Sequence, residues 1–378
     1  MKLIHLSDLH LGIRVNEYSM IEDQKYILEQ IIAAVDDEKP DCVIIAGDVY
    51  DRAVPSAEAV QLFDDLLWSL ATREVKVFVI SGNHDSAERM AFASRMLDAE
   101  GIHISRAYDG ETQRVVLRDG LGEVNIYMLP FIKPATVRRF SEEEITSYTD
   151  AVRLAVSKMD VDETVRNVLV THQFVTGSRR SESEEITVGG TDNVDVTVFE
   201  SFDYVALGHI HSPQNCSSER VRYCGTPLKY SFSEAGENKS VTVVELAAKG
   251  ELTVRTVPLT PMRDLVEIRG SYDELMSRSF YEGTTLREDY VHAILTDEED
   301  VLDAVGRLRT VYKNLMKISY DNTRTRADIS IEAAADVERI SPLQLFAEFY
   351  ETQNNQPMTK EQSDFMRRIM ENVWERGV

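Results

Sequence analysis

Five short apolar runs, each followed directly by side chains that commonly bind metal ions, constrain this 378-residue chain more than any other feature. The runs cover residues 3–7, 42–47, 77–82, 168–171 and 204–208, and the side chains that follow are Asp8 and His10, Asp48, Asn83, His84 and Asp85, His172, and His209 and His211. Apolar runs of this length predict strands. Because ligands of open α/β sheets bind beyond the carboxyl ends of the strands, we expect the five groups to converge on one patch.

The spacing of these runs predicts a layered domain over residues 1–260. Helix-period segments at 20–38 and 56–73 separate strands expected at 2–7, 42–46 and 76–81. The strands at 42–46 and 76–81 are almost continuously apolar, which is typical of a sheet with helices on both faces. Further strands are expected at 113–118, 124–129, 167–171, 203–207, 220–224, 241–246 and 251–257. The predicted fold class is α/β, a layered sandwich of β-sheets flanked by helices.

The pattern changes after Pro258 and Pro261. Strands are predicted at 264–269, 290–295 and 317–320, with one helix between the first two strands and another at 300–316. These elements make a small α+β domain over residues 261–322. Residues 323–340 show no firm periodicity and are expected to be a linker, and residues 341–378 are expected to be a helical segment.

This helical segment contains two helix starts of the capping-box type, Ser341-Pro342-Leu343-Gln344 and Thr359-Lys360-Glu361-Gln362. The second helix carries a wide apolar face made of Phe365, Met366, Ile369, Met370, Val373 and Trp374. So small a segment cannot bury that face by itself. The helix could pack on its own domain, but we favour docking onto a partner helix or coiled coil.

The side chains after the runs offer imidazole, carboxylate and one amide, without thiolate. This set disfavours a structural zinc site and suits Mn²⁺, Mg²⁺, Fe or a catalytic Zn²⁺ pair. Seven ligands are too many for one ion, and a carboxylate such as Asp48 can bridge two ions roughly 3.5–4 Å apart. Residues two apart on an extended segment point the same way, so Asp8 with His10, and His209 with His211, are expected to grip a metal from one side. Glycines before the ligands, at 47, 82 and 208, allow tight turns and close backbone approach.

Other polar residues lie outside this pattern. His5, His103 and His292 are expected to be structural, and Cys42 a small core residue. Arg179 and Arg180 form either a solvated turn or a phosphate contact. Arg14 and Arg89, each close behind a motif, are further candidates for nucleic-acid contacts.

Composition limits the partners and the compartment. The formal net charge of −24 argues against nucleic-acid binding by a general positive field, so any attraction to DNA must be local and partly supplied by bound cations. The first residues meet a carboxylate at Asp8 and do not form a signal peptide, and no apolar stretch reaches the roughly 18 residues of a membrane span. The three cysteines lack paired spacing. We therefore expect a cytoplasmic protein that is not inserted in a membrane.

The motifs resemble those of the calcineurin-like metallophosphoesterase superfamily, and within it more closely those of SbcD-type nuclease subunits. The supporting segments are Ser7-Asp8-Leu9-His10-Leu11-Gly12, Gly47-Asp48-Val49-Tyr50-Asp51, Ser81-Gly82-Asn83-His84-Asp85-Ser86, His172, Ala206-Leu207-Gly208-His209-Ile210-His211 and the segment 225–232. The main match covers about 210 residues.

The resemblance implies a role for each motif residue. One metal would be held by Asp8, His10, Asp48 and His211, and the other by Asp48, Asn83, His172 and His209. His84 would act on the scissile phosphate, with Asp85 orienting its ring, while a metal-bridging hydroxide attacks the phosphodiester. The ions would be Mn²⁺ in preference to Mg²⁺.

The same resemblance implies a partner and a reaction. It suggests a double-strand exonuclease and single-strand or hairpin endonuclease in DNA repair and recombination, with residues 261–322 as a capping domain. Residues 341–378 would bind an SbcC-type ABC ATPase, and the chain would form a homodimer. The chain itself contains no Gly-x-x-x-x-Gly-Lys-Ser/Thr motif, so ATP dependence would come from the partner. The competing hypotheses are a small-molecule phosphodiesterase or phosphatase, and a DNA-end-binding scaffold without chemistry.

Overall fold

The computed structural model describes residues 1–178, 192–323, 343, 346–347, 350 and 358–375. The chain divides into two compact units. The first comprises residues 1–184, 193–266 and 288–291, and the second residues 185–192, 267–287 and 292–378. The four-part division expected from the sequence is finer than this and stays a prediction.

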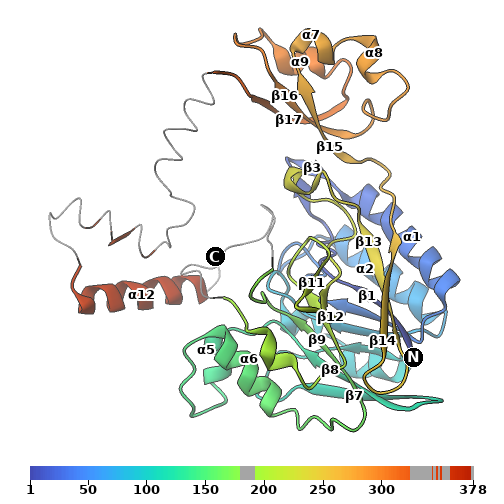
Figure 1. The fold of residues 1–378 in the computed structure, drawn as a ribbon, viewed down its shortest axis with the longest axis vertical. Helices are drawn as coiled ribbons and strands as arrows, with labels where there is room; N and C mark the ends of the chain where they lie inside the picture. Colours follow the sequence, from blue (N-terminus) through green and yellow to red (C-terminus); the bar gives the residue numbers. More distant parts are fainter. Residues whose placement is uncertain (179–191, 324–342, 344–345, 348–349, 351–357, 376–378) are drawn as a thin grey trace. The chain divides into compact units, whose positions relative to one another are not determined.

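Two six-stranded sheets form the first unit (Figure 1). The first sheet has the order β14 (Leu252–Pro258), β13 (Ser240–Leu246), β1 (Lys2–Leu6), β4 (Cys42–Ala46), β5 (Lys76–Ile80) and β6 (Ile102–Ile104). The second has the order β11 (Gln214–Cys216), β12 (Ser218–Tyr223), β10 (Tyr204–Gly208), β9 (Arg166–His172), β8 (Gly122–Leu129) and β7 (Gln113–Asp119). β1, β4, β5 and β6 run parallel to one another, as do β8, β9, β10 and β12.

The two sheets pack face to face. One buried cluster contains Ile44 and Phe78 from the first sheet together with Ile126, Val170 and Ala206 from the second. Helices cover the outer faces: α1 (Ile21–Glu38) and α2 (Ala57–Ala71) lie at the first sheet, and α5 (Pro134–Arg138) and α6 (Tyr148–Ser157) at the second. The layered α/β class is confirmed, but the strands at 42–46 and 76–81 are covered by helices on one face only. The second sheet covers their other face and excludes water equally well, so the apolar run alone does not distinguish the two arrangements.

Local sequence signals set the ends of the helices. Ser56 caps α2 through a hydrogen bond from the Ala59 amide at 3.2 Å, the contact that serine commonly makes at a helix start. α6 was not expected from the apolar pattern, although Ser147 and Asp150 form a full capping box at its start. Short elements complete the unit: β2 (Arg14–Val15), β3 (Tyr18–Ser19), α3 (Ala87–Met90), α4 (Ser94–Leu97), and the 3-10 turns η1 (Asp98–Glu100), η2 (Val196–Phe199) and η3 (Phe232–Glu234).

A third sheet, with three strands, lies mainly in the second unit. Its order is β15 (Leu265–Gly270), β16 (Tyr290–Leu295) and β17 (Asn314–Tyr320), and α7 (Tyr272–Leu275), α8 (Arg278–Tyr281) and α9 (Ala304–Leu308) accompany it. The helix expected at 300–316 is wrong in length, because Asp303 takes a left-handed φ of 51° and β17 already begins at Asn314.

The tail contains α12 (Lys360–Glu375). Its start is the predicted capping box: the Gln362 amide bonds to Thr359 Oγ1 at 3.3 Å, and the Thr359 amide bonds to Gln362 Oε1 at 2.8 Å. The other expected start, at Ser341 and Pro342, lies outside the described residues. No helix in the described part of the chain is long and apolar enough to cross a membrane.

Candidate metal centre

The five groups of side chains lie at the carboxyl ends of parallel strands in both sheets. β1, β4 and β5 end in register, with Leu6 beside Ile45 and Ala46 beside Ile80. In the second sheet Gly208 at the end of β10 lies beside His172 at the end of β9. The facing sheets therefore deliver ligands from two sides to one buried patch, as expected from the sequence.

The loops after these strands take backbone conformations that are rare for residues other than glycine. Asp8, His10, Asp48 and His209 have φ values of 52°, 43°, 46° and 104°. The expectation that Asp8 with His10, and His209 with His211, lie on extended backbone is therefore wrong. Hydrogen bonds between the loops hold this strained form: Asp8 N donates to Gly47 O at 3.0 Å and His10 N to Asp48 O at 2.9 Å. Such strain persists only where surrounding structure over-determines it, and it concentrates at functional sites.

Gly47 and Gly208 allow the close approach that was predicted for them. Gly47 has a φ of 90°, and a Cβ there would overlap the His172 ring. A Cβ at Gly208 would overlap the Ala46 carbonyl oxygen. These two glycines let β4 approach β9 and β10 where the ligands converge.

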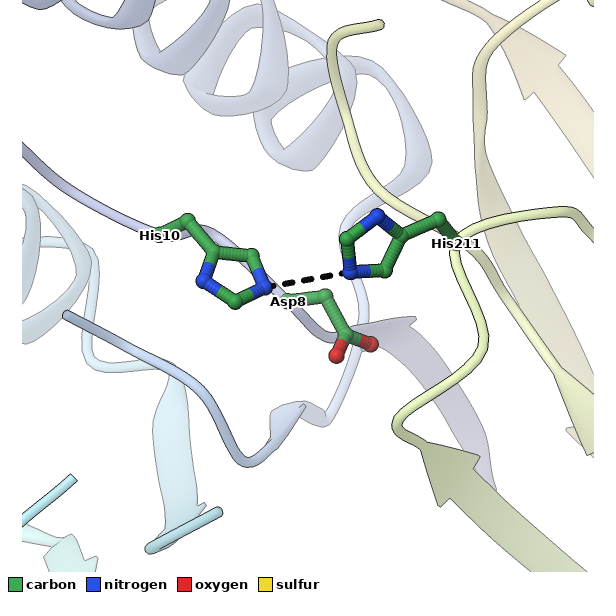
Figure 2. Close-up of side chains that lie close together, drawn as sticks. All are labelled: Asp8, His10 and His211. Carbon is green, nitrogen blue, oxygen red and sulfur yellow. Dashed lines mark hydrogen bonds between the residues drawn. The ribbon is translucent and has the colours of Figure 1, made fainter. Parts of the chain in front are cut away.

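One group of ligands contains Asp8, His10 and His211, whose ligand atoms all lie within 4.8 Å of one another. Figure 2 shows the two imidazole rings turned toward each other above the Asp8 carboxylate, and their Nε2 atoms are 3.2 Å apart. All three residues are buried. The His209 amide also donates to both Asp8 oxygens, at 3.0 and 3.1 Å, so Asp8 links the two sheets.

A second group lies around Asn83. Its Oδ1 is 3.0 Å from His172 Nε2 and 3.0 Å from His209 Nδ1. His172 Nδ1 donates to the Ala46 carbonyl at 2.8 Å, so Nε2 is the nitrogen that a metal ion would bind once it displaced the proton there. This group therefore presents an amide oxygen and two imidazole nitrogens to one point.

Asp48 lies between the two groups. Its Oδ2 is 3.2 Å from His172 Nε2 in one group and 3.7 Å from His10 Nε2 in the other. Burial opposes ionisation of Asp48, but the facing His172 and His84 hold its pKa well below the usual value. Burial also disfavours a charged His172, yet the Asp48 carboxylate outweighs this and raises the pKa of His172 to about 9.

The donor set fits divalent cations. Burial raises the pKa of Asp8 and holds the pKa of His10 well below its usual value, so a bound cation would favour the ionised carboxylate and the neutral imidazole that metal binding requires. Two of the imidazole nitrogens, His10 Nε2 and His211 Nε2, face each other at 3.2 Å. Buried carboxylates and neutral imidazoles pointing at one another are the arrangement that a metal stabilises.

His84 is more accessible than these ligands. Its side chain is 23% exposed, against 3% for His10 and Asp48. Its Nδ1 is 3.0 Å from the Asp51 carbonyl oxygen, and its Nε2 is 4.0 Å from Asp48 Oδ2. The ring therefore lies at the mouth of the metal centre with Nε2 turned inward.

Asp85 makes a different contact from the expected one. Its carboxylate accepts hydrogen bonds from the amides of Val49, Tyr50 and Gly82, at 3.1, 2.9 and 2.9 Å, and Asp51 rather than Asp85 orients the His84 ring. The aspartate side chain is short, so its two carboxylate oxygens reach the nearby backbone amides more easily than the imidazole ring of His84. Burial, followed by the nearby Asp48 charge, raises the pKa of Asp85 to about 6.

Comparison with known proteins agrees with this geometry. The model of the family described as calcineurin-like phosphoesterase matches residues 1–213. The chain belongs to this family. It is a phosphodiester-hydrolysing enzyme of the metallophosphoesterase type.

Relatives narrow the assignment within the family. The SbcD component of the nuclease SbcCD from Staphylococcus epidermidis is 30% identical over 100% of both chains, and the one from Staphylococcus saprophyticus is 31% identical, also over 100% of both. The model described as type 5 capsule protein repressor C-terminal domain matches residues 261–354. This phosphoesterase is accordingly an SbcD-type nuclease, as its motifs predicted.

One solved structure shares a limited likeness with the chain. A dimetal phosphatase from Danio rerio aligns with a TM-score of 0.42 at 12% identity, covering 69% of this chain and 98% of that one.

The remaining predicted residues lie outside the metal centre of this phosphoesterase. Arg14 is exposed and donates to the Glu17 carbonyl in its own hairpin, and Arg89 is exposed on α3. Arg179 lies outside the described residues, so nucleic-acid contacts by these arginines stay predictions. The three histidines expected to be structural each have a hydrogen-bond partner: His5 contacts Tyr204, His103 contacts Asp98, and His292 contacts Glu267 and Ser319. Cys42 is fully buried.

Sequence reasoning missed the residues that hold the ligand loops. Gln24 on α1 accepts from the Gly12 amide and donates to the carbonyls of Leu9 and His10. The Tyr230 hydroxyl donates to the Leu9 carbonyl at 2.7 Å. Gln24 lies in the first turns of the amphipathic helix α1, and Tyr230 lies in the loop after β12. Neither residue belongs to a metal-binding sequence motif, so the sequence alone did not indicate its role.

Proposed function

We propose that the chain is the nuclease component of a DNA repair and recombination complex, acting through two divalent cations, Mn²⁺ in preference to Mg²⁺. The main support for this proposal is the position of Asp48 between two groups of candidate ligands. His10, Asp8 and His211 would hold one cation, Asn83, His172 and His209 the other, and Asp48 both. When bound, the cations supply Lewis-acid charge and a water that ionises near neutral pH.

The chain's own residues would position the DNA and move a proton. The Asp51 carbonyl accepts the Nδ1 proton of His84, so Nε2 is the atom that can hold a proton toward the leaving oxygen or a phosphate oxygen. Asp85 fixes the loops of residues 49–50 and 82 on which this geometry depends. With a net charge of −24, the protein would rely partly on the cations to attract a phosphodiester.

A nuclease assay tests this function. Hairpin DNA and duplexes with blocked ends would be incubated with the purified chain in Mn²⁺ or Mg²⁺, with and without an SbcC-type ATPase. We expect Mn²⁺-dependent endonuclease cleavage of the hairpin and exonuclease degradation of open duplexes. Efficient hydrolysis of a cyclic nucleotide with no cleavage of any DNA would instead favour a small-molecule phosphodiesterase.

We also propose that residues 341–378 bind the coiled coil of an SbcC-type ATPase. Within α12, Phe365 is 57% exposed and Ile369 is 38% exposed, four residues apart on one face. Apolar side chains exposed at this spacing are typical of a helix that docks into a groove. The relatives are named as one component of the nuclease SbcCD, which supports a partner of this kind.

Charging this face should separate binding from cleavage. The double variant Phe365→Glu and Ile369→Glu is expected to lose co-purification with the ATPase, because two carboxylates would be buried at the interface. Cleavage of short DNA by the chain alone should stay within about twofold of wild type. Arg368→Glu, which changes an exposed residue of the same helix, is the control. Retained binding in the double variant would show that this face does not contact the ATPase.

Homodimerisation is a further proposal. Phe92 is 82% exposed and lines a groove of about 530 Å³ together with Val60, Phe63 and Leu67, among others, and Met96, four residues along the chain, is 76% exposed. A surface that carries both protruding apolar side chains and an apolar groove can pair with its own copy about a twofold axis. Sedimentation analysis is expected to give a dimer that Phe92→Glu dissociates; a wild-type monomer at all concentrations would contradict the proposal.

The cytoplasm is the compartment we propose, consistent with three buried free cysteines.

A further inference from the structure

A buried ion pair lies directly behind one ligand of the proposed metal centre. Glu234, at the end of η3, is fully buried, and Lys239, just before β13, is 5% exposed. Glu234 Oε2 is 2.6 Å from Lys239 Nζ. Burying two charges costs more than their attraction returns unless further polar contacts use them.

Lys239 Nζ also pairs with Glu237 Oε2 at 2.8 Å, and the other contacts of the pair converge on His211. Glu234 Oε1 is 3.6 Å from His211 Nδ1, and Lys239 Nζ donates to the His211 carbonyl oxygen at 3.0 Å. The Thr226 amide donates to the same carbonyl at 3.0 Å, and the Thr226 hydroxyl lies 3.4 Å from Glu234 Oε2. The pair therefore holds both the backbone and the ring of His211.

The ring of His211 has two distinct nitrogens, and the structure gives each a different neighbour. Nδ1 faces the Glu234 carboxylate, and Nε2 faces His10 Nε2 at 3.2 Å inside the ligand group. A carboxylate beside Nδ1 favours the tautomer with the proton on that atom. Nε2 then keeps its lone pair directed at the metal position, and the ring becomes a stronger donor.

We propose that Glu234 is a positioning residue that fixes the tautomer and orientation of His211 for one of the two cations, and that Lys239 holds Glu234 in place. The proposal rests on the two-metal centre proposed above. It predicts that Glu234 affects the cation held by Asp8, His10 and His211 and leaves the one at Asn83, His172 and His209 unchanged. A carboxylate that served only to stabilise the fold would not discriminate between the two.

Calorimetric titration of the metal-free full chain with Mn²⁺ alone tests this. Wild type should bind two ions. In Glu234→Gln the affinity for one ion should fall roughly tenfold to a hundredfold, which is the usual effect of losing a carboxylate behind a histidine ligand, and the other affinity should stay within about twofold. Fewer than two ions in wild type would refute the two-metal centre, whereas unchanged affinities in Glu234→Gln would refute the role of Glu234 alone.

Asp203 provides a matched control for lost stability. It is 3% exposed, pairs with Lys249 Nζ at 2.8 Å, and accepts from the Asn167 and Gly250 amides at 2.7 and 3.1 Å, away from the metal centre. Asp203→Asn should lower the melting temperature of the protein and leave both Mn²⁺ affinities unchanged. If Asp203→Asn weakens Mn²⁺ binding as much as Glu234→Gln does, the effect is one of general stability and the proposal fails.

A second variant keeps the test valid if Glu234→Gln does not fold because Lys239 keeps only one of its two carboxylates, Glu237 at 2.8 Å. The double variant Glu234→Gln with Lys239→Met removes both buried charges and should fold, while still losing affinity at one ion only. Lys239→Met alone, which keeps the Glu234 carboxylate near His211, should bind both ions within about threefold of wild type. Equal losses in Lys239→Met and the double variant would overturn the proposal, because Glu234 would then matter only as a partner of Lys239.

Discussion

His84→Asn is expected to reduce DNA cleavage roughly a hundredfold to ten-thousandfold while leaving two Mn²⁺ ions bound. The factor is that of losing a general acid or a charged hydrogen-bond donor at the reacting phosphate. Metal binding should persist because His84 is 23% exposed at the mouth of the centre, and its Nε2 is 4.0 Å from the nearest Asp48 oxygen. Single-turnover cleavage of a hairpin DNA and calorimetry with Mn²⁺ measure the two properties separately.

His103 supplies the control for this experiment. It lies in the same unit, bonds to Asp98 at 2.9 Å, and stacks on Phe78 away from the ligand groups. His103→Asn should cleave DNA at the wild-type rate. Cleavage by His84→Asn within about threefold of wild type would show that the ring has no part in the reaction.

Asp48→Asn is expected to abolish cleavage by removing the shared ligand of both cations. The amide keeps the shape of the side chain and the acceptor for the His84 amide at 2.9 Å, but it loses the charge that faces His172 and His10. Loss of a partner behind a ligand costs about tenfold to a hundredfold in metal affinity, so loss of a direct anionic ligand should cost at least the upper end of this range. Elemental analysis after saturation with Mn²⁺ should find one ion or fewer per chain.

The fold of Asp48→Asn is expected to remain intact, because the amide keeps the size of the side chain and its acceptor for the His84 amide. Circular dichroism should match that of wild type. Two tightly bound Mn²⁺ ions in this variant would mean that Asp48 does not bridge the pair.

The positions of most strands and the convergence of the candidate ligands were predictable because they depend on local patterns. The apolar runs that become β1, β4, β5, β9 and β10 end where polar ligands begin, and parallel strands place those ends together. The exact strand and helix limits agree within one or two residues for α1, α2 and β16. The expected helix at 300–316 failed because a left-handed Asp303 and an early β17 override the apolar spacing.

Contacts made between distant segments were not predictable in this way. The loop conformation at Asp8 and His10 depends on hydrogen bonds to Gly47 and Asp48, and no periodicity in the sequence reports such bonds. The same holds for Asp85, whose neighbour in sequence is His84 but whose carboxylate binds amides of the loop after β4. Glu234 and Lys239 are five residues apart in a polar turn, and their relation to His211 appears only when β10 and β13 are placed in space.

The most direct test of the account is the number of Mn²⁺ ions that the wild-type chain binds, measured by elemental analysis after saturation and gel filtration. Asp48 lies between an Asp8, His10 and His211 group and an Asn83, His172 and His209 group, so two ions per chain are predicted. Magnetic coupling between the two ions in the electron paramagnetic resonance spectrum would accompany them, because a shared carboxylate holds such ions roughly 3.5–4 Å apart. One ion or none per chain would contradict the account.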